Sequence, residues 1–95
     1  GISTPELKLP MAEGEPHAFI RRLQSEGRFP GATDRVTIDG IRAEYPDGFG
    51  LARASNTTPV VVLRFEADDT AALEAIQTTF RRAIDDVWPG LRLPF

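Results

Sequence analysis

The sequence predicts an α+β fold, a two-layer sandwich in which two helices cover one face of an antiparallel sheet. The predicted order of elements is β-α-β-β-β-β-α within a single domain of 95 residues. Consecutive strand patterns are joined by tight turns such as Asp39-Gly40, and strands joined in this way pair antiparallel. Two longer segments, 13–27 and 69–88, carry apolar residues at helical spacing. Each apolar stripe needs a surface to cover, and the sheet supplies it.

The N-terminal third is expected to hold one short strand and one helix. Residues 1–10 resemble an interdomain linker that ends in a strand, because Leu7 and Leu9 alternate with polar residues. A helix is predicted from Glu13 to Gly27, with Pro16 in its first turn, where a missing amide hydrogen does no harm.

Three strands should follow, separated by short turns. Val36 and Ile38 alternate with polar neighbours, and residues 41–45 continue the pattern after the turn. In segment 49–54 one face is predicted to carry large or charged side chains. The opposite face carries only small residues, namely Gly50, Ala52 and Ala54.

The C-terminal third combines the most apolar strand with the longer helix. Segment 60–67 is apolar enough for the middle of the sheet. Asp68 and Asp69 are N-cap candidates, and Pro89-Gly90 should end the helix. Its apolar stripe comprises Leu73, Ile76, Phe80, Ala83, Ile84 and Val87.

Composition narrows the possible functions. The chain has no cysteine, which excludes disulfides, zinc–thiolate sites and a cysteine nucleophile. A net charge of −3 argues against a nucleic-acid binder, and no apolar run is long enough to cross a membrane. The single histidine, His17, is interpreted as a surface residue. Ten of the eleven basic residues are arginine, whose planar fork of donors suits phosphate oxygens.

The segment Arg53-Ala54-Ser55-Asn56-Thr57-Thr58-Pro59 joins two predicted strands and is dense in hydrogen-bond donors. An arginine, three hydroxyls and an amide together match the acceptor oxygens of a phosphate group. The same residue types also populate ordinary polar turns, so the spacing alone leaves both interpretations open.

Residues 39–67 resemble the C-terminal domain of the α-D-phosphohexomutases. That family carries the signature Arg-x-Ser-(Gly or Asn)-Thr-(Glu or Thr)-Pro, which segment 53–59 matches. Asn56 and Thr58 at the variable positions resemble the bacterial phosphomannomutase/phosphoglucomutase branch. Residues 3–6 resemble the point where the family enters its last domain. The resemblance implies a sandwich like that of the TATA-box-binding protein.

The resemblance also implies what the parent enzyme does. It would interconvert hexose 1-phosphates and hexose 6-phosphates through a phosphoserine and a bisphosphosugar, with Mg²⁺ held by another domain. The sequence has no Asp-x-Asp-x-Asp run and no serine-nucleophile segment. The isolated domain is therefore expected to be inactive, with no catalytic residue, no metal ligand and no cofactor of its own. The parent is expected to be a cytoplasmic monomer.

The implied role of this domain is to grip the phosphate of glucose or mannose 1- or 6-phosphate, or of glucose 1,6-bisphosphate. Arg53 matches the family's phosphate-binding arginine. The loop donors are Ser55, Asn56, Thr57 and, less uniformly in the family, Thr58. The other partners would be the remaining domains of the parent.

Three alternatives remain at this point: a free-standing anion-binding module, a protein-interaction domain, and an RNA-binding sheet of the RRM type. The last requires exposed aromatic side chains on central strands, and Phe49 and Phe65 are the candidates.

Overall fold

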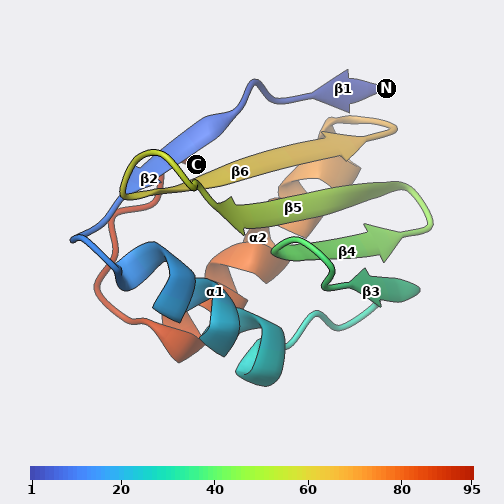
Figure 1. Ribbon diagram of the computed structural model, residues 1–95. Helices are drawn as coiled ribbons and strands as arrows, with labels where there is room; N and C mark the ends of the chain where they lie inside the picture. Colours follow the sequence, from blue (N-terminus) through green and yellow to red (C-terminus); the bar gives the residue numbers. More distant parts are fainter.

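The computed structural model describes residues 1–95 and confirms the two-layer α+β sandwich (Figure 1). Neither helix is long and apolar enough to cross a membrane. The elements in chain order are β1 (Ile2–Ser3), β2 (Leu7–Pro10), α1 (Glu15–Glu26), β3 (Asp34–Val36), β4 (Ile41–Tyr45), β5 (Gly48–Ala54), β6 (Val60–Ala67) and α2 (Thr70–Val87).

The sheet has six strands in the order β1-β6-β5-β4-β3, with β2 also paired to β6, and every pairing is antiparallel. The N-terminal segment therefore forms two short strands, where the sequence predicted a linker and one strand. Thr4 carries the pairing between them, because its N–H donates to the Phe65 carbonyl (2.9 Å) and its Oγ1 accepts from the Phe65 N–H (3.1 Å). Pro5, which has no N–H, interrupts the ladder. The observed order is thus β-β-α-β-β-β-β-α.

Strand β3 ends at Val36, although the alternation of Val36 and Ile38 predicted that it would continue through Ile38. Ile38 is 95% exposed and lies in the connection to β4. The strand is fixed instead by Arg35, whose guanidinium donates to the carbonyl oxygens of Gly27 (3.1 Å) and Gln24 (3.0 Å) at the end of α1. This tie between strand and helix is not visible in the hydrophobic pattern.

The core depends on the small side chains of β5. Gly50, Ala52 and Ala54 share one face of β5, as predicted, and that face meets the helices. The Phe80 ring of α2 lies directly against Gly50. A Cβ at Gly50 would stand 2.4 Å from that ring. Phe80 also packs edge-on against Phe65 of β6, with ring centroids 5.2 Å apart. Both helices consequently lie close to the central strand.

Helix α2 begins and ends as the sequence predicts. Asp69 is the N-cap, and its Oδ1 accepts from the Ala72 N–H (2.8 Å). After the helix, Trp88 packs edge-on against Phe19 of α1, with ring centroids 5.9 Å apart. The C-terminal tail then returns to the core, where the Phe95 ring lies 4.8 Å from that of Phe65.

Tyr45, at the end of β4, has a buried hydroxyl with no hydrogen-bond partner. The Thr79 hydroxyl of α2 donates instead to the Ala75 carbonyl (3.1 Å). Burial raises the pKa of Tyr45, and the smaller influences of Thr79 and Arg35 act in the opposite direction.

Tyr45→Phe should leave the free energy of unfolding unchanged or raise it by about 1 kcal/mol at neutral pH, because it removes an unpaired buried hydroxyl. The raised pKa means that Tyr45 ionises more readily in the unfolded chain. The native protein should therefore lose stability above about pH 10, the ordinary tyrosine pKa. Urea unfolding at pH 7 and pH 10.5 measures both effects. The variant should lack the Tyr45 part of the alkaline loss, and identical pH profiles for the two proteins would contradict this.

Gly40→Ala should destabilise the fold by about 2 kcal/mol or more. The residue has φ +75°, and an added Cβ would also stand 2.1 Å from the Ala52 carbonyl oxygen and 2.7 Å from Arg53 Cβ. Gly14→Ala is the matched control, since Gly14 has φ +81° with nothing within 4 Å. It should cost only the backbone strain, about 1 kcal/mol. Equal losses in urea unfolding would show that the close approach at Gly40 is unimportant.

Candidate functional site

The donor-rich loop is a compact hairpin connection between β5 and β6. The Ser55 N–H donates to the Val60 carbonyl (3.0 Å), and the Val60 N–H donates to the Thr58 carbonyl (2.8 Å). Ser55 Oγ lies at the centre of the loop, where it accepts from the N–H groups of Thr57 (3.3 Å) and Thr58 (3.4 Å). It also contacts the hydroxyls of Thr57 and Thr58, each at 3.3 Å. One serine oxygen therefore shapes the whole loop.

The loop forms one wall of a cavity of about 80 Å³. The opposite wall is the beginning of α1. The loop contributes Ser55, Asn56, Thr57, Thr58 and Pro59, and the helix side contributes Glu13, Gly14, Pro16 and His17.

Four of the five predicted site residues are therefore gathered at one cavity, and Arg53 is apart from them. Arg53 belongs to the face of β5 that points away from the helices, as Phe49 and Leu51 do. Its Nη2 lies 3.9 Å from Glu6 Oε2 in an exposed ion pair. A pair this long and exposed contributes less than about 1 kcal/mol. The guanidinium is therefore free to exchange Glu6 for another anion.

The wall from α1 is the part of the site that the sequence analysis missed. It reaches the loop because β2 pairs with β6, with Pro10 opposite Val60. The Met11 N–H then donates to the Pro59 carbonyl (3.0 Å), which holds the start of the helix beside the end of the loop. His17 is exposed, as predicted, but it lines this cavity. No local sequence pattern predicts a contact between segments almost fifty residues apart.

A larger cavity, of about 430 Å³, lies elsewhere, between the end of α2 and the C-terminal tail. Five of its eight lining residues are hydrophobic, and none belongs to the donor-rich loop. No group of three or more histidine, cysteine, aspartate or glutamate side chains gathers anywhere in the structure as a metal site would require.

The face of the sheet opposite the helices does not offer the aromatic platform that an RRM-type sheet needs. Phe65 points to the core and is fully buried. Phe49 lies on the open face, but the Arg42 guanidinium covers its ring at 3.8 Å from the centroid. Bases therefore have no exposed ring on which to stack, which removes the observation that favoured RNA binding.

Comparison with known proteins gives consistent matches. The family model for the phosphoglucomutase/phosphomannomutase C-terminal domain matches residues 6–83. A phosphoglucomutase of Neisseria gonorrhoeae is 54% identical over 93 residues, which cover 93% of this chain and 20% of that protein. A phosphomannomutase/phosphoglucomutase of Pseudomonas aeruginosa is 48% identical over 94 residues, which cover 99% of this chain and 20% of that protein.

A solved structure agrees with these matches. A phosphoglucomutase/phosphomannomutase family protein of Burkholderia thailandensis shares 57% identity with a TM-score of 0.89, over 99% of this chain and 19% of that one. The chain thus spans about a fifth of the length of the curated relatives it matches.

Ser55→Ala should loosen the loop without unfolding the domain. The change removes the oxygen that accepts from Thr57 and Thr58, while the strand ladders on both sides remain. We expect faster amide exchange and lower order parameters at 56–58, with a loss in unfolding free energy of about 1 kcal/mol or less. Ser25→Ala is the control, because Ser25 bonds only to its own helix. Unchanged dynamics at 56–58 would show that Ser55 does not shape the loop.

Proposed function

The chain belongs to the phosphoglucomutase/phosphomannomutase family, as its C-terminal domain, and from this premise we propose that the loop 53–58 binds the phosphate group of a hexose phosphate. One observation carries the proposal: four neighbouring polar residues of the loop line a single small cavity. They are Ser55, Asn56, Thr57 and Thr58.

The chemistry of these side chains suits a phosphate. Each hydroxyl has one rotatable hydrogen, and the Asn56 amide offers two more donors. The contacts of Ser55 with the Thr57 and Thr58 hydroxyls are 3.3 Å long, at the weak end of the range for O–H donors. A phosphate oxygen can therefore take over these donors without leaving a buried group unpaired. Donors directed at an anion form the stronger, charge-assisted type of hydrogen bond.

Arg53 completes the site in this proposal. Arg53 is the second-last residue of β5, just before the loop, and its guanidinium forms a weak pair with Glu6. A bound phosphate competes with that carboxylate and offers a bidentate partner, which the arginine fork prefers. Arg53 would then hold the phosphate from the open side of the sheet while the loop donors hold it from within the cavity.

The names of the relatives support a proposal for the whole protein. We propose that the parent enzyme interconverts hexose 1-phosphates and hexose 6-phosphates of glucose and mannose through a phosphoserine and a bisphosphosugar. Other domains would supply the serine and a Mg²⁺ site, and we assign no catalytic or metal-binding residue to this chain. Its contribution would be to hold the phosphate that is not reacting. A clamp built from hydrogen bonds accepts either end of the bisphosphosugar as the ligand reorients.

The parent would be a cytoplasmic monomer, whose other domains complete the sugar site. This domain alone supplies only part of the contacts, so we propose a dissociation constant of about millimolar for the isolated chain.

Titration of the chain with glucose 1-phosphate, followed by amide NMR, should shift the signals of residues 53–58, because the phosphate engages these donors. Methyl glucoside, which lacks the phosphate, should leave them in place. Arg53→Ala should weaken binding about ten-fold, the loss expected for one charge-assisted pair. Arg64→Ala is the matched control, since Arg64 is an exposed arginine of β6 on the same sheet face, opposite Leu51.

Equal responses to the phosphosugar and the glucoside would contradict a phosphate site. Equal weakening by the two arginine variants would show that only overall charge matters and that Arg53 has no specific role.

A further inference from the structure

A second hollow adjoins the proposed phosphate site on its helix side. Its volume is about 190 Å³, and it lies between α1 and the connection 37–40 that leads into β4. His17 and Asn56 line both this groove and the smaller cavity at the loop. The two hollows therefore meet at these two residues.

The charges around the two hollows do not suit a phosphate dianion without help. The loop donors are neutral, and Arg53 lines neither hollow. Two carboxylates line the hollows: Glu13 lies beside the loop and Asp39 lies in the groove. Among the lysines and arginines of the chain, only Arg21 lines either one. Arg21 is thus the only permanent positive charge available there to offset the two acids and the ligand.

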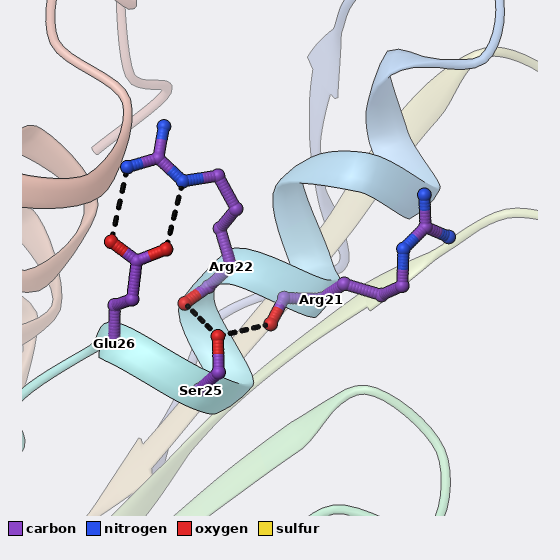
Figure 2. A network of polar contacts seen from close by, with 4 residues as sticks. All are labelled: Arg21, Arg22, Ser25 and Glu26. Atoms are coloured by element: carbon purple, nitrogen blue, oxygen red, sulfur yellow. Dashed lines mark hydrogen bonds and ion pairs between the residues drawn. The ribbon is translucent and has the colours of Figure 1, made fainter.

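Arg21 is also available for a ligand. Its neighbour Arg22 is bound to Glu26 one turn later by two hydrogen bonds, of 3.0 and 3.1 Å. Figure 2 shows the Arg21 guanidinium directed away from this pair. It takes part in none of the ion pairs of the structure, which join Arg22 to Glu26, Arg42 to Glu44 and Arg53 to Glu6.

Arg21 lies on the face of α1 that lines the groove, and a hydrogen bond from α1 to the opposite wall fixes that face. It stands four residues after His17, so the two side chains share one face of α1. The groove behind them is fixed by Gln24, whose amide donates to the Gly40 carbonyl (2.6 Å). This bond ties α1 to the turn that carries Asp39. The helix face and the opposite wall therefore keep their spacing.

We propose that Arg21 and His17 are ligand-binding residues that hold the hexose phosphate from the helix side, with Arg21 supplying the positive charge that the loop lacks. This rests on the proposed function and extends it. The phosphate would be gripped between Arg53 on the open side of the sheet and Arg21 on the helix side, with the loop donors between them. Neither residue falls within the sequence signature at 53–59.

The test compares two neighbouring arginines of one helix in titrations of the 95-residue chain with glucose 1-phosphate. Arg21→Ala should weaken binding about five-fold, as the loss of one exposed charge-assisted contact predicts. Arg22→Ala removes the same charge from the adjacent position, where the side chain faces Glu26, and should change the affinity less than about two-fold. Arg21→Lys should restore part of the loss. His17→Ala should weaken binding by about two- to three-fold.

Both arginine positions are exposed, and amide spectra of the free variants will show that the fold is intact. Equal affinities of Arg21→Ala and Arg22→Ala, with Arg53→Ala still weakened, would overturn the role of Arg21 and leave the phosphate loop standing. If the unmodified chain shows no phosphate-dependent response at any concentration, the proposed function fails and this inference fails with it.

Discussion

The absence of large side chains on one face of β5 is the constraint on which the rest of the structure depends. Gly50 leaves room for the Phe80 ring, and a Cβ in that place would stand 2.4 Å from it. Because Phe80 also packs against Phe29 (4.8 Å) and Phe65 (5.2 Å), this one contact joins α2, β5, β6 and the segment after α1. The helices can therefore approach the sheet closely. Helix α1 then packs close enough to the sheet for its first turn to line the same cavity as the loop at the end of β5 (Figure 1).

The position of α1 along the sheet depends on strand β6, which lies far from α1 in the sequence. Strand β2 fixes it by pairing with β6, and the Met11 N–H bond to the Pro59 carbonyl carries this register up to the loop. The cavity at the loop is thus built by two segments that are distant in the chain and joined by backbone hydrogen bonds. Backbone pairing is indifferent to most side chains, so this geometry tolerates substitution of the surrounding surface.

Local patterns predicted the features that local interactions decide. Alternation, the turns and the Asp69 cap placed β4, β5, β6 and α2, because each depends on residues close in sequence. The predicted strand at Val36 exists as β3, but its end was placed too late, because the hydrogen bonds of Arg35 to the end of α1 outweigh the alternation that continues to Ile38. The prediction also missed β1, whose pairing continues through Thr4. The donor loop was found because its donors are consecutive. The α1 wall was not found, since pairing between distant strands determines it. The alternation in segment 49–54 did place Arg53 on the face opposite Gly50, Ala52 and Ala54.

The neutral loop donors and the exposed Arg53 pair would suit the proposed phosphate clamp, which must release its ligand as well as bind it. The donors within the loop are neutral and already hydrogen-bonded to one another, so the free loop has no large desolvated charge to stabilise. The Arg53 guanidinium lies 3.9 Å from Glu6, an exposed contact that would exchange for the proposed phosphate at little cost in free energy. A buried, fully paired arginine would bind more tightly, but breaking such a pair costs several kcal/mol. Under the proposed function the intermediate would turn within the site, so the same phosphate contacts would be made and broken in every catalytic cycle, which favours the weaker arrangement.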